Sequence, residues 1–352
     1  MKYLFLTPRE FMRIFVKNRF WLLVLSIAWI STPLMAQNTN IIRAAIDIGS
    51  GGPKLRVAEV DLTTNKIVKI LYVKQYPVIF QEDLSRSGDS TLSPGIMSKG
   101  LNAIKDAIVL AKSYKTEGIV IIGTSVFRNA INGESFANTI HQETGLQVHI
   151  LDQKLEGKLA FHAVLARMDV NTENLVVWDI GGGSTQFIGT ALDGSYLIDG
   201  SNEGSGPFRD FIIESIQGRN IKEYRSPNPI SHKHADLAEA HAYALSAKVD
   251  QIFKNKFRNS ATEIVGVGSV FGRGIISLMG GKNSFTIEEF TTVVNTLIGK
   301  TDEDLGGGDF ACIEVSNALL TLGLMKGLNI SQMRILDANN TEGAMVYKFF
   351  WE

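Results

Sequence analysis

Two glycine-rich segments hold the residues with the clearest chemical potential. Segment 47–54 reads Asp-Ile-Gly-Ser-Gly-Gly-Pro-Lys, and segment 179–186 reads Asp-Ile-Gly-Gly-Gly-Ser-Thr-Gln. Glycines let the backbone approach a ligand closely, and successive N–H groups with neighbouring hydroxyls can bind one anion. The leading aspartates would repel a bare phosphate, so we expect a divalent cation between protein and ligand. The two segments together predict a site for a phosphorylated ligand and a metal ion.

The chemistry assigns a role to each residue type in these segments. We expect the aspartates Asp47 and Asp179 to hold the cation, Mg²⁺ through water molecules. The predicted phosphate ligands are Gly49, Ser50, Gly51 and Lys54 in the first segment, and Gly181, Gly182, Gly183, Ser184 and Thr185 in the second.

The flanking residues predict the elements that position these segments. Apolar stretches at 44–48 and 175–178 run into the two segments, and further apolar stretches at 54–60 and 187–189 leave them. Each glycine segment is therefore expected at the tip of a β-hairpin rather than ahead of a helix. Because the same pattern occurs twice, the chain is expected to contain a duplicated unit with one phosphate loop and one carboxylate in each half.

On these residues the chain resembles the exopolyphosphatase/guanosine pentaphosphate phosphatase (Ppx/GppA) family of the actin-like ATPase superfamily, over nearly all of its length after residue 40. The resemblance implies an α/β, two-domain, actin-like (ribonuclease H-like) fold with the active site in the interdomain cleft. Domain I would span 41–155, joined by a terminal helix at 342–352, and domain II would span 156–341. The implied activity is release of the terminal phosphate from polyphosphate or from a polyphosphorylated nucleotide.

The resemblance also implies further site residues. Glu156 aligns with the second acid of the family's Glu-Glu-Ala motif, which is the catalytic base, whereas Leu155 replaces the first acid. Arg128 lies in a segment similar to one that lines the family's cleft, and its planar fork would clamp a phosphate. Gln186 replaces the family's glutamate, and is the residue that apyrases use at this hairpin to orient the attacking water.

These departures leave other functions open. The glutamine at position 186 is compatible with an apyrase-like nucleoside di- or triphosphate hydrolase, and Lys54 after a glycine loop resembles the hairpin of sugar kinases. The substitutions are equally compatible with a catalytically inactive relative that binds a phosphorylated ligand.

Periodicity and turn residues predict the remaining elements. We expect a loop over 81–93, a helix from Pro94, a strand over 118–123 and a helix from Leu155 to Arg167 that bridges the two domains. One long helix is expected over 231–253.

The first 36 residues have the pattern of an export signal. Five basic residues precede the apolar run 20–30, and Ala36 stands at a plausible cleavage site. An exported, periplasmic or secreted protein is therefore expected, with a membrane anchor if the segment is not cleaved. Without residues 1–36 the chain has 30 basic and 35 acidic residues, a formal charge of −5. This charge argues against binding to nucleic acid duplexes. The sequence leaves the oligomeric state open, a homodimer included.

Overall fold

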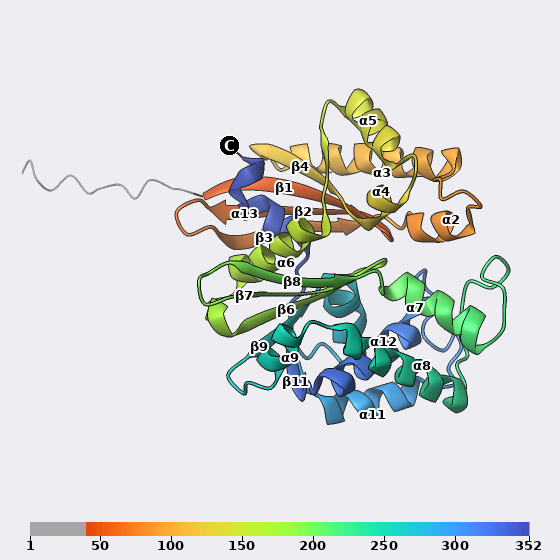
Figure 1. Ribbon diagram of the computed structural model, residues 1–352. Coiled ribbons are helices and arrows are strands. Elements are labelled where there is room, and N and C mark those ends of the chain that lie inside the picture. The colour runs from red at the N-terminus through yellow and green to blue at the C-terminus, as the bar shows by residue number, and fades with distance from the viewer. Residues whose placement is uncertain (1–39, 352) are drawn as a thin grey trace, which may run out of the picture. The chain divides into compact units, whose positions relative to one another are not determined.

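The computed structural model describes residues 40–351, and the predicted signal segment 1–36 lies outside them. The described part contains two β-sheets with the same core topology (Figure 1). The first sheet has the order β3-β2-β1-β4-β5. The second has the order β10-β11-β9-β6-β7-β8, so that β8-β7-β6-β9-β11 repeats the arrangement of the first. The duplication predicted from the two hairpins is therefore visible in the topology.

The strands of the first sheet are β1 (Asn40–Gly49), β2 (Gly52–Asp61), β3 (Lys66–Gln75), β4 (Gly118–Gly123) and β5 (Val148–Ile150). Those of the second are β6 (Leu175–Ile180), β7 (Thr185–Thr190), β8 (Tyr196–Ser201), β9 (Glu263–Val267), β10 (Ser284–Thr286) and β11 (Gln332–Ile335). In each sheet three antiparallel strands follow one another, and the next strand along the chain pairs parallel to the first of them. This pairing places the carboxyl ends of β1 and β4, and of β6 and β9, at one edge of each sheet.

The α-helices in the first half of the described chain are α2 (Phe80–Arg86), α3 (Pro94–Ser113), α4 (Ser125–Asn129), α5 (Gly133–Thr144) and α6 (Gln153–Arg167). Those in the second half are α7 (Ser205–Phe211), α8 (His232–Leu245), α9 (Gln251–Phe257), α10 (Ile276–Leu278), α11 (Ile287–Leu297), α12 (Ala311–Leu328) and α13 (Asn340–Val346). π-helical turns follow α7 (η2, Ile212–Ile216) and precede α10 (η4, Val270–Ile275), and 3₁₀ turns are η1 (Thr172–Asn174), η3 (Ser246–Lys248) and η5 (Lys348–Phe350).

Helix α6 packs against both sheets. Leu159 and Ala166 join the apolar cluster of the first sheet, whereas Ala160, Phe161 and Val164 join that of the second. A helix that is apolar on most sides is suited to such a position, because both of its faces leave water. The Asp152 side chain accepts a hydrogen bond from the Leu155 N–H (2.7 Å) and so fixes where the helix begins.

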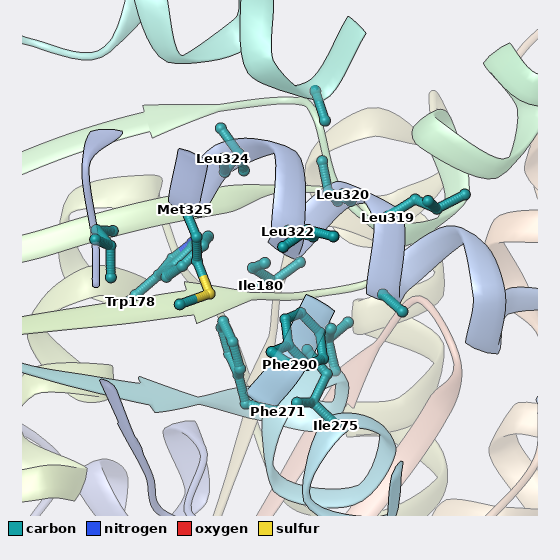
Figure 2. Packing of buried hydrophobic residues seen from close by; sticks show 14 of the residues in the cluster. Trp178, Ile180, Phe271, Ile275, Phe290, Leu319, Leu320, Leu322, Leu324 and Met325 are labelled. Carbon is teal, nitrogen blue, oxygen red and sulfur yellow. The ribbon is translucent and has the colours of Figure 1, made fainter. Parts of the chain in front are cut away.

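The largest apolar cluster lies on the other face of the second sheet. Trp178 and Ile180 of β6 pack there with leucines of α12 and with Phe271 and Phe290 (Figure 2). Helix α12 is apolar and long enough to cross a membrane by composition alone, but 78% of its length is buried within the fold. Helix α12 is therefore a core helix of this cluster.

Three expected elements differ in the structure. The terminal helix predicted over 342–352 is α13 (Asn340–Val346), which ends where Tyr347 is extended before η5. The predicted loop 81–93 begins with helix α2, because Phe80 and Leu84, four residues apart, are both buried and Arg86 pairs with Glu82 (2.9 Å). The predicted single helix 231–253 is broken after η3, where Val249 is extended and Asp250 begins α9 by accepting from the Ile252 N–H (2.8 Å). A local N-cap therefore overrides the continuous apolar pattern at this point.

Candidate functional site

The two glycine segments lie at hairpin tips that touch each other. The first tip follows the pair Gly49–Gly52, and the second follows Ile180–Thr185. A side chain at Gly182 would place its Cβ 2.5 Å from the Ser50 Cβ, so the approach of the two loops requires glycine there. Gly52 has a φ of +110°, and an added Cβ would lie 2.1 Å from the Tyr76 carbonyl oxygen. Each loop thus contains a position that only glycine can occupy.

A cavity of about 270 Å³ lies at these tips. Most of the predicted phosphate ligands line it, namely Gly49, Ser50, Gly51, Lys54, Gly181, Gly182 and Ser184. Gly183 and Thr185 do not line the cavity. Gly183 packs against Ser125, and the Thr185 hydroxyl donates a hydrogen bond to the Glu203 carbonyl (2.6 Å). The phosphate-binding roles of all nine residues stay predictions.

Three buried carboxylates, Asp47, Asp179 and Glu156, also line the cavity. Each stands at the end of a different element: Asp47 on β1, Asp179 on β6 and Glu156 in the first turn of α6. Burial raises the pKa of all three, since removal from water penalises the charged form. For Asp179, burial and the nearby negative charges of Glu156 and Asp47 raise the pKa to about 7. The cavity thus concentrates acidic groups that favour a compensating cation.

The donor set at Asp47 and Asp179 fits a hydrated divalent cation. The Asp47 Oδ1 atom is buried without a hydrogen-bond partner, and its other oxygen lies 3.7 Å from Lys54 Nζ. Within residues 40–351 there is no cluster of three or more acidic, histidine or cysteine side chains that could hold a metal alone. A cation bound by the two aspartates would therefore complete its shell with water or ligand oxygens, as Mg²⁺ commonly does.

Arg128 lies behind Glu156 rather than on the cavity wall. Its Nη1 atom donates to Glu156 Oε2 (2.7 Å) and to the Leu151 carbonyl oxygen (2.7 Å). Burial raises the pKa of Glu156, and the positive charge of Arg128 offsets part of this rise by favouring the charged carboxylate. The predicted phosphate clamp is thus engaged with the predicted base, and its contact with a ligand stays a prediction.

Gln186 is buried beside Gly157, the residue that follows Glu156. It is 1% exposed, neither of its amide atoms has a hydrogen-bond partner within the described chain, and a Cβ at Gly157 would lie 2.9 Å from its Oε1. The residue therefore packs beneath the start of α6. Its predicted role in orienting a water is not tested by this geometry.

Several residues on the cavity wall were not singled out from the sequence. Ser125, whose hydroxyl lies 3.1 Å from that of Ser50, follows β4 next to the first loop. The strand parallel to β1 would have indicated this position, because parallel strands end at the same edge. Others come from several separate parts of the chain and include Gln75, Ser205, Arg273, Phe310, Glu314, Asn317, Asn339 and Asn340.

Gly268 explains the glycine turn after β9. It has a φ of +84°, and an added Cβ would lie 2.2 Å from the Asp179 Oδ1 atom. The turn therefore lets the backbone close over the Asp179 carboxylate, which a larger residue would displace.

Comparison with known proteins agrees with this architecture. Residues 60–191 match the model of the Ppx/GppA phosphatase family, a range that includes Glu156 and the second loop but begins after the first. The bifunctional 3-dehydroquinate synthase/phosphatase of Fusobacterium nucleatum is 29% identical over 153 residues, which are 42% of this chain and 23% of that protein. The guanosine-5'-triphosphate,3'-diphosphate pyrophosphatase of Aliivibrio fischeri is 27% identical over 146 residues, 41% of this chain and 28% of that protein. The matches thus span about a quarter of these relatives.

Solved structures show the same fold over most of the chain. The Aquifex aeolicus member of the Ppx/GppA family superposes with a TM-score of 0.67 at 17% identity, covering 89% of this chain and 98% of that one. An exopolyphosphatase from Cytophaga hutchinsonii gives a TM-score of 0.67 at 16% identity, with 88% and 97% covered. The predicted resemblance to the family is confirmed, and so is the predicted α/β fold, which the chain shares with these Ppx/GppA structures.

Proposed function

We propose that this protein, which has the fold of the Ppx/GppA phosphatases and matches their family model over residues 60–191, hydrolyses phosphoanhydride bonds. The substrate would be polyphosphate or a polyphosphorylated nucleotide, and the terminal phosphate would be released. The observation that supports this most directly is the meeting of two glycine loops and three buried carboxylates in one cavity.

Each group on the wall has a task that suits its chemistry. The N–H groups of the two loops, with Ser50 and Ser184, would bind phosphate oxygens and set the line of attack. A divalent cation, Mg²⁺, would be held by Asp47 and Asp179, and it would neutralise charge on the phosphates. Lys54, 3.7 Å from Asp47, would add positive charge on the same side.

Glu156 would accept the proton of the attacking water. The water oxygen forms a bond to the terminal phosphorus, and the bond from that phosphorus to the bridging oxygen breaks. The bridging oxygen leaves on the shortened product. Burial raises the pKa of Glu156, and the ion pair with Arg128 acts in the opposite direction by favouring the charged form that accepts a proton.

The test is phosphate release by the purified full chain with polyphosphate and nucleoside triphosphates offered in parallel. We expect release in the presence of Mg²⁺, loss of release with a chelator, and recovery when Mg²⁺ is added back. Glu156→Gln should lower the rate by roughly 10²- to 10⁴-fold, because it removes the base and keeps the shape. The matched control is Glu134→Gln at an exposed position at the start of α5, which should leave the rate unchanged.

Two outcomes would contradict the proposal. A folded protein that releases no phosphate from any of these substrates would be a binding protein built on a phosphatase fold. A Glu156→Gln variant as active as the parent would remove the carboxylate from the mechanism.

Export of the protein is a separate proposal that rests on the sequence pattern of residues 1–36 alone. N-terminal sequencing of the protein recovered from a periplasmic or secreted fraction would test it. A mature N-terminus after Ala36 supports cleavage, whereas an intact Met1 in the membrane fraction supports an anchor.

A further inference from the structure

A second cavity, of about 790 Å³, lies at the carboxyl end of α6, the helix between the two sheets (Figure 1). Its wall is formed by the turn between β2 and β3, by the last turns of α6 with the residues up to Val170, and by residues 346–349 at the end of α13. Within the described residues it shares no lining residue with the cavity that contains Glu156. Because α6 has 15 residues and a helix rises about 1.5 Å per residue, its ends are roughly 20 Å apart. The second cavity is therefore separate from the proposed active site.

The wall of this second cavity is mostly apolar. Leu165, Met168 and Val170 contribute aliphatic surface on one side, and Val346 does so on the other. The Phe349 side chain lines the same cavity and is 65% exposed, so it presents apolar surface that a ligand could cover. Methionine is unbranched and flexible, and adapts to ligands of irregular shape. A mostly apolar cavity of about 300–1,000 Å³ with a few polar groups is typical of sites for small organic ligands.

The charged groups of this wall leave one cation without a partner. The Lys66 ammonium donates to the carbonyl oxygens of Leu165 (2.7 Å) and Met168 (2.8 Å). Its charge is balanced by Asp169, whose Oδ1 atom lies 2.8 Å away, so all three of its protons are engaged. Lys348 is exposed, and within the described residues its side chain has no ion pair or hydrogen bond. The wall therefore has an uncompensated positive charge, which favours an anionic group on the ligand.

His162 adds a neutral polar group to the same wall. Its Nε2 atom lies 2.9 Å from the Tyr196 hydroxyl, and the Tyr347 ring packs beside it with the centroids 5.0 Å apart. Burial and the neighbouring charge of Lys158 lower the pKa of His162, so the ring is neutral at physiological pH. With the tyrosine hydroxyl donating to Nε2, the proton of the neutral ring is on Nδ1, which has no hydrogen-bond partner in the described part of the chain. Lys348 and His162 thus both offer a donor that suits a carboxylate.

We propose that this second cavity binds a small alkyl carboxylate, with the alkyl chain against the aliphatic side chains and Phe349, and the carboxylate beside Lys348 and His162. A cationic ligand is disfavoured because Asp169 is already neutralised by Lys66, whereas Lys348 would repel it. A bound ligand would contact the β2–β3 turn, α6 and the end of α13 together, and so would stabilise the folded protein. This site is independent of the proposed hydrolysis, which takes place at the other end of α6.

Calorimetry with three ligands of equal chain length tests the site. Octanoate, octanol and octylammonium are titrated separately into the full-length protein at neutral pH, below the concentrations at which they form micelles. We expect saturable binding of octanoate, at least about tenfold tighter than that of octanol or octylammonium, because only the carboxylate gains a charge-assisted hydrogen bond from the wall.

Two variants at exposed positions locate the site. Lys348→Gln should weaken octanoate about tenfold and octanol less than about twofold, since it removes the charge and keeps the apolar wall. Phe349→Ala should weaken all three ligands several-fold, because the ring would cover part of the alkyl chain. The matched controls are Lys112→Gln on α3 and Ile131→Ala, which are exposed and distant from the lining residues, and they should leave every affinity unchanged.

The proposed carboxylate site would be overturned by octanol binding as tightly as octanoate, or by Lys348→Gln protein with the octanoate affinity of the parent. Octanoate binding that Phe349→Ala leaves unchanged would place the ligand elsewhere on the chain and would contradict the site as well. The proposed hydrolysis is tested separately by phosphate release. A protein that binds octanoate selectively but releases no phosphate would support this site and contradict only the hydrolase.

Discussion

Glu156 and Arg128 form the closest ion pair at the site. The carboxylate is 6% exposed, and its Oε2 atom lies 2.7 Å from Arg128 Nη1. Burial raises the pKa of Glu156, whereas Arg128 acts in the opposite direction by favouring the charged form. At the scale of single residues, the pKa of the proposed base therefore depends on its burial first and then on a side chain that does not line the cavity.

This balance predicts a change in the pH dependence of catalysis. Arg128→Gln removes the charge that lowers the pKa of Glu156, so that pKa should rise. Because the base works only when deprotonated, the acid limb of the kcat/KM profile should move to higher pH by the same amount. Arg128→Lys keeps a charge and should move the limb less. The measurement is the rate of phosphate release from about pH 4, near the ordinary pKa of a carboxyl group, to about pH 9.

The same profile distinguishes two roles for Arg128. A fall in rate at every pH with an unmoved acid limb would mean that the guanidinium binds substrate, as the sequence predicts for a phosphate clamp. A moved limb with a recovered rate at high pH would make it a positioning residue for Glu156.

The wall residues show which parts of a site the sequence can predict. Asp47, Asp179 and the glycines stand in recognisable hairpin segments, and the structure brings them into one cavity. Phe310 and Asn317 have no such signal, because α12 reads as an ordinary apolar helix. Their place on the wall depends on how that helix packs against the second sheet, which no local pattern encodes.

At the scale of elements, helix α13 crosses α6 with its backbone in contact. A Cβ at Gly343 would lie 2.0 Å from the carbonyl oxygen of Leu159, and the next two residues, Ala344 and Met345, are fully buried. The Glu342 side chain caps the same helix by accepting from the Asn339 N–H (3.0 Å). Only glycine, whose side chain is a hydrogen atom, therefore fits at position 343.

Gly343→Ala should consequently destabilise the protein although alanine favours helices. The added methyl meets backbone, which cannot move as a flexible side chain would, and we expect a loss of about 3 kcal/mol or more in the free energy of unfolding. Gly95→Ala in α3, whose nearest atom to an added Cβ lies 4.0 Å away, is the matched control. The control should be neutral or stabilising by about 0.5–1 kcal/mol. Urea unfolding of both variants measures the difference, and equal stabilities would contradict the backbone contact.

The elements that the sequence mispredicted share a physical cause. Helix α2 is only seven residues long and its helical signal is limited to Phe80, Leu84 and one ion pair, which a polar stretch conceals. The break between α8 and α9 depends on a cap at Asp250, within a stretch whose apolar spacing continues. In both places a contact between residues close in the sequence determines the local structure, although the polarity of the surrounding residues predicts a different one.

At the scale of the whole described chain, an ionic cluster centred on the buried side chains of Arg56 and Glu342 links the first sheet to the segment that follows the second. Arg56 on β2 of the first sheet donates to Glu342, and its Nη2 atom lies 2.5 Å from Asp337 Oδ1. Both acids belong to the segment that leaves β11 of the second sheet. Arg167 at the end of α6 lies 3.3 Å from Glu342. The duplication seen in the two sheets could be predicted from the hairpins, whereas this junction could not, because its members are up to 286 residues apart.

The cluster should behave as one energetic unit. Arg56 is 3% exposed and Glu342 is fully buried, so removal of either partner leaves a charge away from water. We expect Arg56→Met to reduce the free energy of unfolding by roughly 3–5 kcal/mol, since the remaining arginine is the more distant one. Glu342→Gln should also destabilise, while the double variant leaves a neutral amide in place of the unpaired carboxylate. The double variant should therefore be more stable than the sum of the single effects by about 1–3 kcal/mol.

Urea unfolding of the four proteins at one pH and ionic strength completes this cycle. The matched control is Lys105→Met with Glu143→Gln, an exposed pair at 2.8 Å that also links distant elements, α3 and α5. An exposed pair is screened by water, so its coupling should stay below about 1 kcal/mol. Strictly additive effects of Arg56→Met and Glu342→Gln would show that the two sheets are held together by their apolar contacts with α6 and α13 alone. A large coupling at Arg56 and Glu342, with little at the exposed pair, would locate the junction between the sheets in the buried cluster.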